Sequence, residues 1–131
     1  WKNCEKNLHF LKSKKKKGRI LEAPPSMFKI KADYDNKPFL RYLDLTFKNK
    51  LIKKYIKNVN FNNGYILTLS HPAQVILKKK HGLLGFGVNN YLKNIKQIVQ
   101  RIEKKGLKYR FYHIEDLLNL QNLNKLKTYE K

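Results

Sequence analysis

Cysteine is almost absent from this chain, which has one in 131 residues. Cys4 therefore cannot form a disulfide within the chain, and it lacks the neighbouring ligands of a zinc site. No apolar run approaches the roughly 18 residues that a membrane-spanning helix needs. No signal peptide is visible, because the lysine run at 14–17 is followed by a mixed, proline-containing stretch. The sequence leaves the cellular compartment open.

Acidic residues are also scarce. Nine Asp and Glu face 30 Lys and Arg, so the formal net charge is +21. Such a charge favours nucleic acid or another anionic partner. However, only four of the basic residues are Arg, the side chain that binds phosphate and guanine bidentately. The lysines are spread along every segment and form blocks only at 14–17 and 78–80. We therefore expect most of this charge to be solvated surface.

Aromatic residues interleave with lysine between positions 34 and 65, a pattern that could stack single-stranded nucleic acid. Helical and strand spacing assigns most of these rings to the core instead. A nucleic-acid partner is therefore possible but not favoured.

The apolar patterns predict an α/β fold. Strands are expected at 19–23, 65–69 and 108–112, each a short β-rich run bounded by turn residues. Helical spacing predicts helices over 47–59, with Asp44 as N-cap, and over 92–102, capped by Asn89 or Asn90 and ended by Gly106. A short helix is expected from 114. This alternation implies parallel strands joined by helical crossovers.

The domain organisation predicted from these patterns has three parts. Residues 1–18 are a basic leading segment, 19–120 contain the strands and helices, and 121–131 are a polar tail. Three strands cannot close a barrel, and their outer edges would be unpaired. Together with a first residue that is Trp1, this favours an origin in a larger sheet of a longer polypeptide.

His71 is the strongest candidate for chemistry. It follows the apolar run at 65–69, and functional side chains gather at the carboxyl ends of strands in α/β folds. Its imidazole could be a general acid, a general base or a metal ligand, or it could be a packed structural side chain. Pro72 fixes the chain direction beside it. Leu69 and Pro72 flank it and are candidate substrate contacts.

The remaining candidates are weaker. His81 lies in a lysine- and glycine-rich loop where a surface role is expected, and His113, after the third predicted strand, is more often structural in such a place. The spacing of Gly82–Gly87 is not that of a phosphate loop, which leaves a flexible substrate-facing loop or a plain connector. Asp33 and Asp35 suit a turn. No HExxH, HxxxH or CxxC motif occurs, so no metal site is complete within this chain.

Several segments, in order, resemble the polysaccharide deacetylases of the NodB-homology type. Residues 20–26 (ILEAPPS) resemble the family's E-(I/A)-P-x-S strand end, and 41–44 (RYLD) the segment after it. Residues 64–72 are similar to the late strand that ends in L-x-x-H-P. Residues 92–118 resemble the closing helix, the last strand and the final turn. The resemblance spans roughly residues 19–120.

This resemblance implies the last part of a deformed (β/α)7 barrel, and an enzyme that removes N-acetyl or O-acetyl groups from a glycan. In that family zinc or another divalent metal is held by an Asp and two His of early motifs, which have no match in this chain. The family's late His, a general acid toward the leaving group, matches His71. The chain is then expected to be a carboxyl-terminal portion, inactive alone, that needs its missing amino-terminal part.

Two other functions remain open from the sequence. A small basic RNA-binding or ribosome-associated protein would explain the charge directly and would need no missing part. A substrate-binding domain that has lost catalysis would keep the α/β scaffold.

Overall fold

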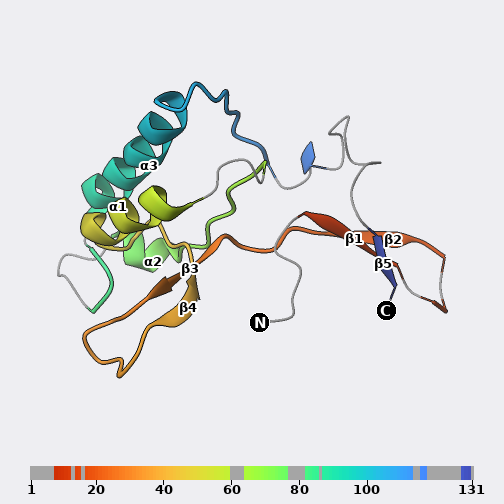
Figure 1. The fold of residues 1–131 in the computed structure, drawn as a ribbon, viewed down its shortest axis with the longest axis horizontal. Coiled ribbons are helices and arrows are strands. Elements are labelled where there is room, and N and C mark those ends of the chain that lie inside the picture. Colours follow the sequence, from red (N-terminus) through yellow and green to blue (C-terminus); the bar gives the residue numbers. More distant parts are fainter. Residues whose placement is uncertain are drawn as a thin grey trace. The chain divides into compact units, whose positions relative to one another are not determined.

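The computed structural model describes residues 8–12, 14–15, 17–59, 64–76, 82–85, 87–113, 116–117 and 128–130. Cys4, His81, the lysine block at 78–80 and most of the predicted helix from 114 and of the tail lie outside these residues. The elements are β1 (His9–Lys12), β2 (Arg19–Glu22), β3 (Met27–Ile30), β4 (Phe39–Tyr42), α1 (Asn49–Asn58), α2 (Pro72–Val75), α3 (Gly87–Glu103) and β5 (Thr128–Glu130) (Figure 1). The chain forms two compact units: unit 1 comprises 1–24 and 110–131, and unit 2 comprises 25–109.

Unit 1 contains a three-stranded sheet in the order β2-β1-β5. β1 and β2 form an antiparallel hairpin in which His9 is opposite Glu22, and β1 pairs with β5 in parallel. Gly18, with φ of +112°, lies immediately before β2, where its backbone conformation favours glycine. The buried His9 has its Nε2 3.3 Å from Glu22 Oε2. β2 is therefore held in the sheet by its antiparallel pairing with β1, the strand that precedes it in the chain.

Unit 2 begins with a second antiparallel hairpin, β3–β4, in which Met27 is opposite Tyr42. Asp35, in the connection between the strands, accepts a hydrogen bond from the Ala32 backbone N–H at 2.7 Å. Both carboxylate oxygens of Asp35 also accept hydrogen bonds from Arg41 Nη2, each at 2.8 Å. The Ala32 hydrogen bond and then Arg41 lower the pKa of Asp35 below its ordinary value. The two Asp residues of this connection were predicted to suit a turn, and Asp35 does close one.

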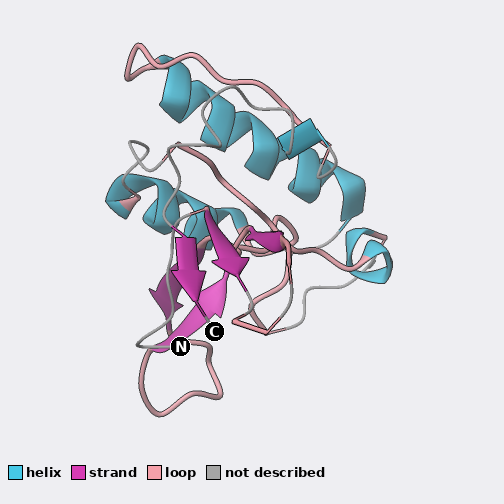
Figure 2. Cartoon of the chain, turned by 90° about the vertical axis from the view of Figure 1, so that its right-hand side faces the viewer, coloured by secondary structure: helices cyan, strands magenta, loops and turns pink. Residues whose placement is uncertain are grey.

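Helices α1 and α3 pack side by side in unit 2 and are its longest regular elements (Figures 1 and 2). The predicted helical periodicity is confirmed, because Ile52 and Tyr55 of α1 and Ile98 of α3 are buried. Leu92, expected on the same apolar face, is instead 54% exposed. Gly106 follows the end of α3 as predicted: its φ is +70°, and its N–H donates a hydrogen bond to the Glu103 carbonyl.

The core of unit 2 lies between the hairpin, the two helices and the segment 43–47. The Tyr55 ring packs edge-on against Phe28, with ring centroids 5.2 Å apart. Burial raises the pKa of the Tyr55 hydroxyl, and a hydrogen bond with Ser26 partly opposes this rise. The buried core residues are Ile30, Ala32, Leu43, Leu45, Phe47, Ile52, Tyr55, Leu83 and Ile98.

The predicted α/β fold with parallel strands and helical crossovers is wrong. Of the three predicted strands, only 19–23 forms one, and β2 pairs antiparallel with β1. Residues 65–69 and 108–112 are not in any strand ladder. The described residues contain one parallel pairing, β1 with β5, and it does not join successive strands through a helix. No (β/α) barrel portion is present in the part of the chain that the structure describes.

The reason for this difference is visible at 65–70. This segment makes two backbone hydrogen bonds to the hairpin: Ser26 N–H donates to the Leu67 carbonyl at 2.9 Å, and Leu69 N–H donates to the Leu43 carbonyl at 3.0 Å. Ser26 immediately precedes β3 and Leu43 immediately follows β4, so both hydrogen bonds lie at the open end of the hairpin. An apolar run that crosses the end of a hairpin is extended and half-buried without forming a ladder.

Candidate functional site

His71 is exposed, at the point where the extended segment 65–70 enters helix α2. It is the N-cap of that helix, with φ of −84° and ψ of 132°. Pro72 follows at the first helical position, where a missing N–H costs nothing, and it holds the preceding residue in an extended conformation. The His71 N–H donates to Gln74 Oε1 at 3.3 Å, and the His71 carbonyl accepts from the Gln74 N–H at 2.9 Å.

The residue before His71 is anchored by a buried carboxylate. Asp44 is 1% exposed, and its Oδ1 accepts hydrogen bonds from the Ser70 hydroxyl at 2.8 Å, from the Thr46 N–H at 2.8 Å and from the Thr46 hydroxyl at 2.6 Å. Ser70 Oγ in turn accepts from the Leu45 N–H at 3.2 Å. This network fixes the backbone next to His71 while the imidazole stays open to solvent.

The predicted role of Asp44 as a helix cap is therefore wrong. Helix α1 begins five residues later, and its N-cap is Lys48. Asp44 lies in the stretch 43–47, whose apolar side chains enter the core, while its carboxylate accepts hydrogen bonds from Thr46 and Ser70. Residues 45 and 46 form a turn in which the Phe47 N–H donates to the Asp44 carbonyl at 3.1 Å.

The other predicted site residues lie as follows. Leu69 is 46% exposed and Pro72 is exposed, on either side of Ser70 and His71. His113 is exposed in unit 1, where its N–H donates to Asp116 Oδ2 at 3.2 Å. Residues 82–85 of the glycine-rich loop lie along the start of α1: Lys48 N–H donates to the Leu83 carbonyl and Gly85 N–H to the Thr46 carbonyl.

No candidate metal site was found among the described residues, where no three His, Cys, Asp or Glu side chains come close enough to hold an ion. The described helices also include none that is long and apolar enough to span a membrane.

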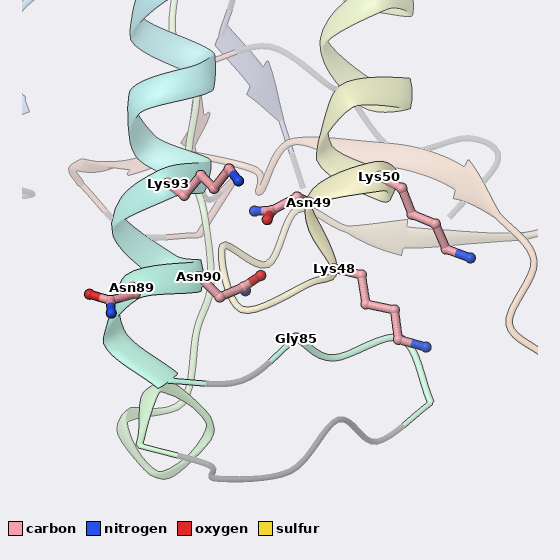
Figure 3. Close-up of a pocket in the computed structure, with 7 residues that line it drawn as sticks. All are labelled: Lys48, Asn49, Lys50, Gly85, Asn89, Asn90 and Lys93. Atoms are coloured by element: carbon pink, nitrogen blue, oxygen red, sulfur yellow. The ribbon is translucent and has the colours of Figure 1, made fainter.

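A cavity of about 610 Å³ lies where the beginnings of α1 and α3 meet the glycine-rich loop (Figure 3). Asn49, Asn90 and Lys93 lie between the two helices in this view, whereas Asn89 and Lys50 point outward on opposite sides. The lining residues are Lys48, Asn49, Lys50, Gly85, Asn89, Asn90 and Lys93. The sequence did not single out this cavity, because lysine and asparagine are common throughout the chain and only the tertiary fold brings these together.

Two asparagines of α3 tie this helix to the segment beside the cavity. Asn94 is fully buried; its Nδ2 donates to the carbonyls of Leu45 at 2.8 Å and Phe47 at 2.7 Å, and its Oδ1 accepts from Asn49 at 2.6 Å. Asn90 Nδ2 donates to the carbonyls of Thr46 at 3.2 Å and Phe47 at 3.1 Å. Asn90 was predicted to be a possible helix cap, but its side chain holds a neighbouring segment instead.

Gly85 allows this arrangement. A Cβ at position 85 would lie 2.3 Å from Asn90 Nδ2, closer than any real contact. Position 85 therefore requires glycine, because the Asn90 side chain approaches its backbone too closely to leave room for a Cβ.

Comparison with protein-family models, curated proteins and solved structures found no significant match.

Proposed function

We propose that His71 is the general acid of a hydrolase that removes N-acetyl or O-acetyl groups from a glycan. The observation that carries the proposal is an exposed imidazole on a fixed backbone, after the extended segment 65–70 and before Pro72. The ordered resemblance of residues 19–120 to polysaccharide deacetylases supports it. The proposal concerns His71 and its chemistry and does not include the parallel barrel.

The chemistry suits an imidazole. Cleavage of an amide passes through a tetrahedral intermediate whose collapse requires a proton on the departing nitrogen. A histidine with a pKa near 6.5 can supply that proton at neutral pH. His71 would donate from a ring nitrogen to the amine of the sugar, and Leu69 and Pro72, exposed on either side, would contact the glycan.

The metal that the resemblance implies does not fit the described residues, which lack a group of three ligands. No step of the proposal is therefore assigned to it. We propose that a zinc or other divalent ion would be held by a further part of the same polypeptide, and that the present chain alone has no hydrolase activity.

The test is acetate release from N-acetylated and O-acetylated glycan oligomers by the longest natural polypeptide that contains this chain. We expect His71→Ala to lower kcat by roughly 100-fold or more, in the range of general-acid contributions. His71→Ala should also remove the decline of kcat on the basic side of the pH profile, because that decline reports the acid. His113→Ala is the matched control, an exposed histidine in the other unit, and should retain activity. Turnover by His71→Ala within about threefold of wild type, or no acetate release by the wild-type polypeptide, would contradict the proposal.

A second candidate function is binding of RNA. The observation that favours it is the net charge of +21 together with a cavity that three lysines line. Any chain of this charge binds polyanions at low salt, so the informative measurement is affinity for single-stranded RNA at about 200 mM salt. Saturable binding that survives this salt supports the RNA function, whereas loss of binding contradicts it.

A further inference from the structure

The cavity between α1 and α3 has the size of a small-molecule site and the charge of an anion site. Its volume of about 610 Å³ falls within the range of ligand pockets, roughly 300–1,000 Å³. Lys48, Lys50 and Lys93 line it, and none of its lining residues among those described is Asp or Glu. An anion that enters therefore meets three ammonium groups without opposing carboxylates.

Among the residues that the structure describes, none of these three lysines is seen in an ion pair. The ion pairs of His9 with Glu22 and of Arg41 with Asp35 do not involve the cavity. Neither α1 nor α3 has an acidic residue in its first turn. The positive ends of both helix dipoles add to the lysine charge at this place.

The wall behind the lysines is fixed before any ligand arrives. The side-chain amides of Asn90 and Asn94 donate hydrogen bonds to backbone carbonyls of 45–47 at 2.7–3.2 Å. These bonds tie α3 to the segment that leads into α1. Lys93 lies between these two asparagines in sequence, so the same contacts hold its position on the helix. Its side chain reaches between the helices in Figure 3. The backbone that carries Lys93 is thus ordered before binding, and its side chain is ordered on binding.

We propose that this cavity binds the phosphate group of a small phosphorylated ligand. A phosphate monoester has up to two negative charges and several acceptor oxygens, and an ammonium group is a common phosphate donor. Lys93 contacts the phosphate from α3, and Lys48 and Lys50 contribute charge from the beginning of α1. This site is distinct from His71, because none of the lining residues belongs to the His71 network.

The test is a titration of the ¹⁵N-labelled chain with sodium phosphate, followed by ¹H–¹⁵N correlation spectra and compared with sodium chloride at equal ionic strength. We expect saturable shifts of the amides at 48–50, 85 and 89–93 with phosphate only. Lys93→Gln should weaken binding roughly tenfold or more, the loss typical of a charge-assisted hydrogen bond.

Lys53→Gln is the matched control. It removes the same charge from an exposed position of α1 outside the cavity lining, and its affinity should stay within about twofold of wild type. Equal weakening by Lys93→Gln and Lys53→Gln, or identical shifts with phosphate and chloride, would overturn the proposal. Circular dichroism verifies folding, and the double variant Lys48→Gln/Lys50→Gln should also weaken binding if Lys93→Gln is unfolded.

Further titrations separate the sources of the phosphate. Adenosine 5′-monophosphate that binds more tightly than inorganic phosphate, with the same Lys93 dependence, identifies a nucleotide-sized ligand. Equal affinities identify the free ion. A ten-nucleotide RNA that binds equally with and without a 5′-phosphate, and independently of Lys93, contradicts the site and favours charge spread over the surface. His71→Ala should leave phosphate binding unchanged, so this proposal and the hydrolase proposal can fail separately.

Discussion

Replacing Asn94 by aspartate tests the hydrogen bonds that hold α3 to the segment 45–47. The two side chains have nearly the same size, so the packing of the fully buried position is preserved. The donor group is not preserved. Asn94 Nδ2 lies 2.8 Å from the Leu45 carbonyl oxygen and 2.7 Å from the Phe47 carbonyl oxygen, and an aspartate would place a carboxylate oxygen there.

The magnitude follows from what each carbonyl retains. The Phe47 carbonyl keeps its hydrogen bond from Asn90, so losing the bond from Asn94 costs about 1 kcal/mol, the net value of one ordinary hydrogen bond. The Leu45 carbonyl loses the donor that Asn94 supplies, which costs about 1–3 kcal/mol. The bond from Asn49 to Oδ1 can remain. We therefore expect Asn94→Asp to lower the free energy of unfolding by about 2–4 kcal/mol.

The assay is urea unfolding followed by circular dichroism at 222 nm. Asn58→Asp is the control, since it makes the same chemical change at an exposed position at the end of α1. Its expected cost is below about 0.5 kcal/mol, typical of surface substitutions. A stability of Asn94→Asp within about 0.5 kcal/mol of wild type would refute the reasoning, because two buried hydrogen bonds would then contribute nothing.

The remaining predictions concern pH and close packing. The pKa of Asp35 is lowered by the Ala32 N–H and by Arg41, so its contribution to stability is present above the ordinary pKa of about 3.8 and is lost as the pH falls through the lowered value. Asp35→Asn should therefore show a flatter dependence of the urea midpoint on pH below about 4 than wild type, and an unchanged slope would contradict the assignment. Gly85→Ala should cost about 1–3 kcal/mol in the same assay, because the new Cβ would displace Asn90. Stability equal to wild type would show that Asn90 can move without loss.

The helices of unit 2 could be predicted from the sequence because their signal is local. Ile52 and Tyr55, three residues apart, share one face of a helix, and the structure buries both. Gly106 likewise marks the end of α3 through its own backbone conformation. The beginnings of the helices were less predictable, because Asp44 and Asn90 are residues that favour caps but are used here for long-range hydrogen bonds.

The strands could not be placed in the same way, because a strand depends on its partner. Residues 19–22 pair with 9–12, a segment whose lysine-rich surroundings indicated no strand. Residues 65–69 have the composition of a buried strand, yet they meet the hairpin through only two backbone hydrogen bonds, at Ser26 and Leu43. The composition predicts extended and partly buried backbone, and it does not predict which segment, or in which direction, will pair with it.

The two candidate sites differ in the same respect. His71 could be singled out because an apolar run, a histidine and a proline are adjacent in the sequence. The cavity could not, because Lys48 and Lys93 are 45 positions apart in a chain where lysine is the dominant charge. The contacts of Asn90 and Asn94 with 45–47, together with the packing of α1 against α3, bring these lysines together.

The segment 44–49 contributes to both candidate sites. The Asp44 carboxylate accepts from the Ser70 hydroxyl and so holds the residue next to His71. The carbonyls of Leu45 and Phe47 accept from Asn94, and the segment then delivers Lys48 to the cavity. A change at Asn94 acts on the carbonyls of Leu45 and Phe47 and leaves the Asp44 hydrogen bonds in place. Asn94→Asp should therefore lower the affinity for phosphate more than it changes the amide signals of Ser70 and His71. Equal effects on both sites would mean that the segment moves as a single rigid piece.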